Sequence, residues 1–219
     1  MKVKAFVFGI CIAAACLDVE ASPPSVVEDL IRSAQNSGET IDVRAAAIYA
    51  LRRHFAFPEA REAVVRLADK DSNLPIRWIS LRILGRAAWD LDTKRFLARK
   101  VEKESNEPLK VEAIRSLGFV LSDDSIYRSL LNEFNRAVAL PIKYSLTKSL
   151  YYAVLQGNAE ALRKVRETAR DPDPVLRKAA IETLSGDSWV FAHWICPDNP
   201  VECSPAHHDP YRPPPPYYK

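Results

Sequence analysis

Residues 74–85, LPIRWISLRILG, decide the fold, because the pattern of this stretch recurs along the chain with a period of 33 residues. Shifting the sequence by that period aligns a proline column, made of Pro75, Pro108, Pro141 and Pro174. The next position is aliphatic in every copy: Val43, Ile76, Leu109, Ile142 and Val175. A leucine column follows, shifted by one residue in the last copy: Leu51, Leu84, Leu117, Leu150 and Leu184. Five copies of one helix-sized pattern at a fixed period predict a repeat protein.

Helical periodicity fills the space between these copies. Apolar residues recur three and four positions apart from Ser25 onward, and no stretch of any length alternates apolar and polar residues as a strand does. The first helices of the pairs are predicted to begin near Ser25, Pro58, Asp92, Asp123 and Asn158. The second helices are predicted to begin near Ile41, Leu74, Pro108, Leu140 and Pro174. One pair alone has too little apolar surface to be stable, whereas stacked pairs bury a continuous core. The sequence therefore predicts an all-α solenoid of about five helix pairs over residues 24–186.

A turn signature supports this fold. An acidic residue precedes a basic residue by six positions in three copies: Asp71 and Arg77, Glu104 and Lys110, Asp171 and Arg177. This signature resembles that of the HEAT family, particularly the short HEAT-like repeats found in phycobilin lyases. The resemblance implies that the basic residues bind the turn carboxylates within and between pairs and form a structural ladder. The fourth copy departs from the signature, with Ala137 at the acidic position.

The first 21 residues have the composition of an export signal. Lys2 and Lys4 precede an apolar stretch, residues 5–15, that is too short to span a bilayer as a helix. Cleavage after Ala21 starts the mature chain at Ser22. In the alternative, residues 12–16 resemble a bacterial lipobox, and cleavage there leaves a lipid on Cys16. We therefore expect residues 1–21 to be a signal peptide and the protein to be periplasmic or secreted, or else lipid-anchored to the cell envelope.

Residues 188–219 differ in composition from the predicted solenoid, which covers residues 22–187. The aromatic stretch SWVFAHWI, residues 188–195, is expected to cap the open end of the last pair, and the four prolines at 213–216 favour an extended arm. In an oxidising compartment Cys196 and Cys203 are predicted to form a disulfide. Six residues separate these cysteines, more than structural zinc sites place between paired cysteines, so no metal site is predicted.

Candidate binding residues lie on the second helices. Because Ile76, Ile79 and Ile83 face the core, Trp78 and Arg82 point away from it at about 100° per residue. Such rows line the concave surface in HEAT-like solenoids, and Gly85 and Gly118 in a neighbouring row are expected to leave room for a partner. The predicted partner-binding residues are Tyr49, Trp78, Arg82, Arg115, Tyr144, Lys148 and Tyr151. In the alternative interpretation, this is a solvated face whose aromatic side chains only cover neighbouring helices.

Composition narrows the function. A net charge of +3 is too small to indicate nucleic-acid binding. The solenoid contains one histidine, His54, and neither a glycine-rich phosphate loop nor a hydrolase motif, so no cofactor and no enzymatic activity are predicted. The expected function is an exported scaffold that holds an acidic or mixed acidic-apolar segment of another protein on its concave face. The alternatives are a lipid-anchored envelope scaffold that recognises partners through its Pro/Tyr-rich tail, and a lyase-like enzyme.

Overall fold

The computed structural model describes residues 24–118 and 123–186, and this part of the chain is helical, without strands. The first pair is α1 (Pro24–Gln35) with α2 (Ile41–Leu51), and the second is α3 (Pro58–Lys70) with α4 (Leu74–Leu84). The third is α5 (Leu91–Lys103) with α6 (Glu107–Leu117), the fourth α7 (Asp124–Arg136) with α8 (Leu140–Ser149), and the fifth α10 (Ala159–Thr168) with α11 (Pro174–Ser185). The short helices η1 (Arg52–His54), η2 (Gly85–Ala87) and α9 (Tyr151–Leu155) follow α2, α4 and α8. The predicted all-α solenoid of about five helix pairs is therefore confirmed.

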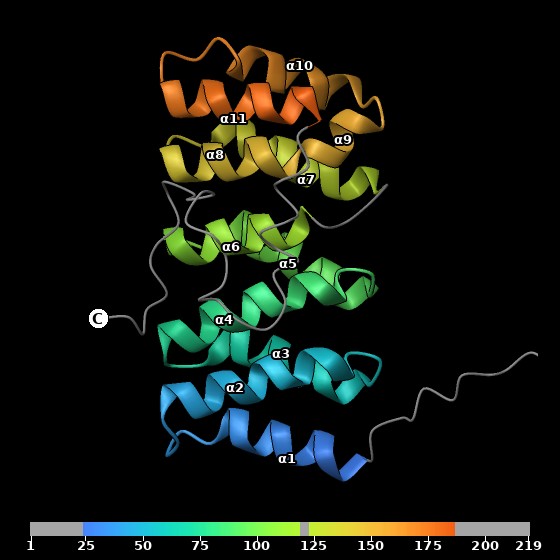
Figure 1. The fold of residues 1–219 in the computed structure, drawn as a ribbon, viewed down its shortest axis with the longest axis vertical. Coiled ribbons are helices and arrows are strands. Elements are labelled where there is room, and N and C mark those ends of the chain that lie inside the picture. Colours follow the sequence, from blue (N-terminus) through green and yellow to red (C-terminus); the bar gives the residue numbers. More distant parts are fainter. Residues whose placement is uncertain (1–23, 119–122, 187–219) are drawn as a thin grey trace, which may run out of the picture.

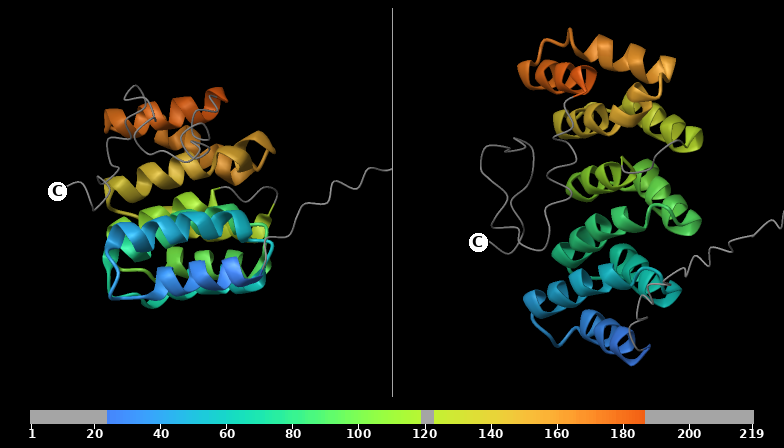
Figure 2. Two further views of the ribbon diagram at one scale, coloured as in Figure 1. Left: turned by 60° about the horizontal axis from the view of Figure 1, so that its bottom comes forward. Right: turned by 45° about the vertical axis from the view of Figure 1, so that its right-hand side comes forward.

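The pairs stack along one axis (Figure 1) and form two layers. The second helices α2, α4, α6, α8 and α11 pack successively against one another and form one layer, and the first helices form the other. The right-hand view of Figure 2 shows the two layers side by side. Each pair packs mainly on its neighbours in sequence, which is the arrangement of a helical solenoid.

The second helices begin at polar caps that precede the proline column. The Asn73 side chain accepts a hydrogen bond from the backbone N–H of Ile76, and Asn106 does the same for Leu109. Proline in the next turn makes no demand for a donor there, because the first N–H groups of a helix have no intrahelical partner. Each such cap is worth about 1 kcal/mol. The helix starts are therefore encoded by an Asn-x-Pro or Asp-Pro pattern, of which the sequence analysis used only the proline.

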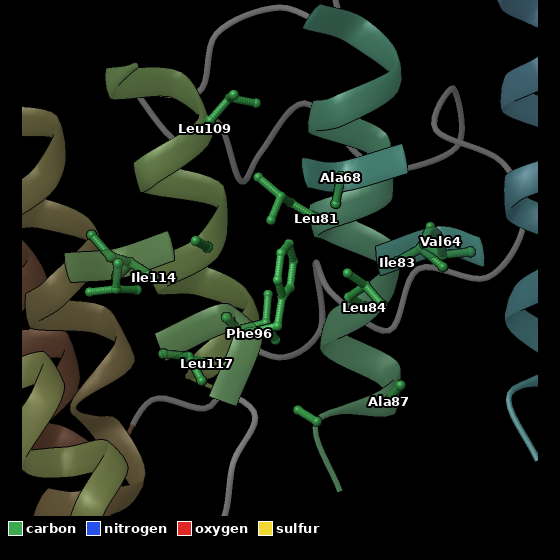
Figure 3. Close-up of a cluster of buried hydrophobic side chains, with 14 of the residues drawn as sticks. Val64, Ala68, Leu81, Ile83, Leu84, Ala87, Phe96, Leu109, Ile114 and Leu117 are labelled. Atoms are coloured by element: carbon green, nitrogen blue, oxygen red, sulfur yellow. The ribbon is translucent and has the colours of Figure 1, made fainter. Parts of the chain in front are cut away.

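The leucine column lies at the centre of the core. Leu51, Leu84, Leu117 and Leu150 have no solvent-exposed surface. Figure 3 shows Leu84 and Leu117 on either side of Phe96, which α5 contributes from the first-helix layer. Burying a leucine side chain contributes about 1.5–3 kcal/mol, so this one column holds a large share of the stability.

Buried hydroxyl groups tie the second helices together. The hydroxyl of Ser116 donates to the carbonyl oxygen of Leu81 at 2.8 Å, and Ser149 donates to Ile114 at 3.2 Å. Each bond joins a helix to the preceding one in the layer. Gly118 belongs to this contact, because a Cβ there would lie 2.9 Å from the Ser149 hydroxyl oxygen. The prediction that Gly118 leaves room for a partner is wrong, since the space is filled by Ser149.

Several sequence predictions fall on residues outside the described part of the chain. They are the signal peptide over residues 1–21, the lipid on Cys16, the aromatic cap and proline-rich tail over residues 188–219, and the disulfide between Cys196 and Cys203. Of the helices in residues 24–118 and 123–186, none is long and apolar enough to cross a membrane. The same residues contain no cluster of His, Cys, Asp and Glu side chains that could hold a metal ion.

Candidate protein-interaction face

The basic column joins each helix pair to the next. The guanidinium of Arg44 pairs with the carboxylate of Asp71, and Arg77 pairs with Glu104 at 3.0 Å. Asp71 and Glu104 also accept backbone N–H groups of their own turns, at 2.9 Å and 3.1 Å. Each carboxylate thus organises a turn and binds the preceding pair, and charge-assisted bonds of this kind are stronger than neutral ones.

The column changes where the signature is incomplete. Because Ala137 replaces the acidic residue of the fourth turn, the ammonium of Lys110 reaches Glu133 of α7 instead, at 2.7 Å. Glu133 lies one helical turn before Ala137. In the last pair, Arg177 donates to the carbonyl oxygens of Asp171 and Pro172, at 2.8 Å and 2.7 Å, and not to the Asp171 carboxylate. We name these contacts of Arg44, Arg77, Lys110 and Arg177 the turn ladder.

A second ladder crosses the first-helix layer, and the sequence analysis missed it. Arg61 of α3 pairs with Asp90 at 3.3 Å, and Lys94 of α5 pairs with Asp123 at 2.7 Å. Both carboxylates also cap the helices that follow them, α5 and α7. The signal was present in the sequence, because Lys94 and Asp123 lie one period of 33 residues after Arg61 and Asp90.

These contacts change the pKa values of the capping carboxylates. The hydrogen bond from Lys94, followed by that from Ser125, lowers the pKa of Asp123 to about 2, although burial opposes the shift. Burial raises the pKa of Asp90, but hydrogen bonds from the backbone and hydroxyl of Thr93 and the charge of Arg61 outweigh it, so the pKa is lowered. Both carboxylates are therefore ionised at neutral pH.

The seven residues predicted to bind a partner lie on α2, α4, α6, α8 and α9, and we refer to them as the second-helix face. They differ in exposure. Trp78, Tyr144 and Tyr151 are only 4%, 6% and 5% exposed, whereas Tyr49 and Arg82 are half-buried. The expectation that the aromatic residues stand as open platforms is wrong.

The reason is the close packing of successive second helices. Trp78 belongs to the main core cluster, and Tyr144 packs on Leu176 and Ala179 of α11. A helical angle gives the direction of a side chain relative to its own helix. It does not give the distance to the next helix in the layer, and this distance decides burial. Gly85, which was also expected to leave room, is buried as well.

Charged side chains run along the second-helix face. The Arg82 guanidinium lies 5.4 Å from the ring centroid of Trp78, within cation–π range. Arg115 lies 3.8 Å from Glu112 of the same helix, and Lys148 binds Glu182 of α11 at 2.7 Å. Burial lowers the pKa of the Arg115 guanidinium, although the charge of Glu112 opposes the shift.

The row of charges is largely removed from solvent. Glu112 and Lys148 are buried, and one carboxylate oxygen of Glu112 is enclosed without a hydrogen bond. Tyr151 on α9 donates its hydroxyl to the carbonyl oxygen of Gly186 at 3.0 Å. The face therefore combines cationic, anionic and aromatic groups from four successive second helices, α4 to α11.

Comparison with known structures supports the HEAT-like fold. The chain is similar to a chain in the structure of the complex of CpcE and CpcF of phycocyanin lyase from Nostoc sp. PCC7120. The TM-score is 0.58, the sequence identity is 16%, and the match covers 88% of this chain and 73% of that one. No family model matches the sequence, and neither does any curated protein. The chain folds as a HEAT-like helical solenoid.

This comparison corrects one prediction. The sequence analysis expected no enzymatic activity, partly because the repeat body lacks known catalytic motifs. The similar structure belongs to a lyase, so that expectation is contradicted. A solenoid of this type serves an enzyme without a glycine-rich loop or a hydrolase motif to announce it.

Proposed function

We propose that the solenoid is a protein-binding scaffold, and that it holds an acidic or mixed acidic-apolar segment of another protein on the second-helix face. The observation that carries this proposal is the line of Arg82, Arg115 and Lys148 along three successive helices, with Trp78 and Tyr144 between them. Arginine and aromatic side chains dominate the binding energy of protein interfaces. An acidic segment complements the cationic members of this line.

The face is not needed to join the repeats. The turn ladder and the hydroxyl bonds of Ser116 and Ser149 already connect neighbouring pairs. Removing charged groups from water is costly, and apolar residues of the same size stack helices at least as well. Glu112 and Lys148 therefore point to a binding role. The similar structure is itself a complex of two proteins, CpcE and CpcF, which supports a protein partner.

Arg82 is the residue to test, because it is half-buried and its loss leaves the ion pairs of the face intact. We expect Arg82→Glu to weaken binding of an acidic ligand on the order of tenfold, since it places a carboxylate beside Trp78. The measurement is selection of random twelve-residue peptides, displayed on phage, against the immobilised full chain. Affinities of the enriched peptides then follow by fluorescence anisotropy.

Arg128→Glu is the matched control, because Arg128 is an exposed arginine on the first helix α7. The selected peptides should be rich in acidic residues and should bind the control as they bind the wild type. Enrichment of basic peptides, or equal affinity for Arg82→Glu at unchanged helical content, would contradict the proposal.

We also propose that the scaffold works outside the cytoplasm, with residues 1–21 as its signal. The basis is the sequence alone: two lysines, an apolar stretch and a cysteine pair in the C-terminal segment. The intact mass of the full chain expressed in a secreting bacterial host should match a start at Ser22, with Cys196 and Cys203 resistant to alkylation until reduced. A lipid-sized increase on a chain starting at Cys16 would support the lipid-anchored alternative, and a retained residue 1–21 segment would refute export.

A lyase-like activity is the second candidate function. One observation favours it, the similarity to a chain of the phycocyanin lyase complex over 88% of this chain. The test is visible absorption of the full chain mixed with a phycobilin pigment. A changed pigment spectrum that Arg82→Glu restores to that of the unbound pigment would favour this function over peptide binding.

A further inference from the structure

A groove lies between α3 and α5, in the layer opposite the second-helix face. Two adjoining cavities, of about 340 and 320 Å³, form it. Phe96 and Arg99 line both cavities, so the groove is continuous along α5. From Asp92 at one end to Lys103 at the other, α5 rises about 16 Å, which an extended peptide covers with about five residues.

One end of this groove is apolar and held in place. Trp89, just before α5, is 64% exposed, and Leu91 beside it is 54% exposed. The guanidinium of Arg61 lies 5.0 Å from the Trp89 ring centroid, and it is itself fixed by Asp90 and by the carbonyl oxygen of Phe55. An exposed tryptophan held by a fixed arginine is a rigid anchor that binds a side chain with little loss of conformational entropy.

The other end is basic. Arg99 and Lys103 are exposed and stand one turn apart on α5, and neither has an ion-pair partner within residues 24–118 and 123–186. Lys100, between them in sequence, is by contrast neutralised by Asp69 at 3.0 Å and Glu104 at 3.2 Å. The groove therefore offers two uncompensated cations at the end away from Trp89.

We propose that the α3–α5 groove binds a short extended segment of a partner protein, with an apolar or aromatic side chain against Trp89 and carboxylates at Arg99 and Lys103. A nucleic-acid backbone fits less well, because Glu62, Asp90 and Asp92 line or flank the Trp89 end and repel phosphates. This surface is independent of the second-helix face. With both surfaces, the scaffold holds two segments on opposite layers.

The test is an array of synthetic seven-residue peptides probed with the full chain. Each peptide carries one Trp, Phe or Leu and two Glu at increasing separations, and each has a counterpart with Lys in place of Glu. We expect wild type to bind the glutamate peptides with separations of about three to five residues, and not the lysine counterparts. Arg99→Glu with Lys103→Glu should reduce affinity on the order of tenfold, and Trp89→Ala several-fold.

The control is Arg163→Glu with Arg166→Glu, which makes the same charge change on the exposed surface of another first helix, α10. This control and Arg82→Glu should bind the peptides as wild type does. Loss of binding in Arg82→Glu but not in Arg99→Glu with Lys103→Glu would assign the peptides to the second-helix face and overturn the groove, leaving the proposed function intact. Absence of binding by any peptide in the array would also overturn it.

Discussion

Asp123 connects three functions at the scale of a single residue. Its carboxylate caps α7, accepts hydrogen bonds from Ser125, and binds Lys94 of the preceding first helix. The same arrangement occurs one period earlier at Asp90, which caps α5 and binds Arg61. A single carboxylate can serve both roles because one oxygen faces the helix end and the other faces the neighbouring repeat.

The lowered pKa of Asp123 gives a pH dependence with a definite sign. The folded pKa of about 2 lies below the ordinary value of 3.8, so the carboxylate stabilises the fold above pH 4, and this contribution is lost as the pH falls from 4 towards 2. Asp123→Asn keeps a capping side chain but loses the charge. We expect wild type to exceed it in unfolding free energy by up to about 2 kcal/mol at pH 6, with the difference shrinking below pH 4.

Urea unfolding followed by circular dichroism at pH 6, 4 and 3 measures this difference. Asp124→Asn provides the control, because Asp124 is the exposed neighbour in the first turn of α7. A difference between wild type and Asp123→Asn that stayed constant from pH 6 to pH 3 would show that the Lys94 contact does not depend on the charge of Asp123.

At the scale of the helix, recurrence in the sequence predicted what repeats and missed what substitutes. The columns containing Pro75 and Leu84 located the second helices, because every copy needs the same helix start and the same buried leucine. The pairing of Lys110 with Glu133 was not predictable from the turn signature, because Glu133 lies on the preceding helix and takes over from the missing carboxylate of Ala137. The groove beside Trp89 was missed because Trp89 lies outside the second helices, on which the search for binding residues concentrated.

The burial of Trp78 has a different origin. The helical angle correctly set Trp78 apart from Ile76 and Ile79 along α4, yet all three are buried. In a solenoid the second helices pack on neighbours in both directions along the stack as well as on the first-helix layer. Such a helix has more than one buried side, and periodicity within one helix reports only the stripe shared with its own partner.

At the scale of the whole molecule, stability depends on contacts between neighbouring pairs, since few contacts join distant ones. A defect in a central pair should therefore spread to its neighbours and weaken with distance along the stack. Leu117 on α6 is fully buried in the core, and Leu117→Ala should cost about 2–5 kcal/mol locally. We expect faster amide hydrogen exchange in α4, α6 and α8, and a smaller change in α1.

Hydrogen exchange with mass spectrometry on the full chain resolves these helices, and Leu184→Ala is the matched variant. Leu184 occupies the same column on the terminal helix α11 and is only partly buried, so its loss should accelerate exchange less and mainly in α8, α10 and α11. Equal acceleration in every helix for Leu117→Ala, α1 included, would mean that the solenoid opens as one unit. The nearest-neighbour description would then fail, and a partner bound at α3 and α5 would stabilise α11 as strongly as it stabilises α4.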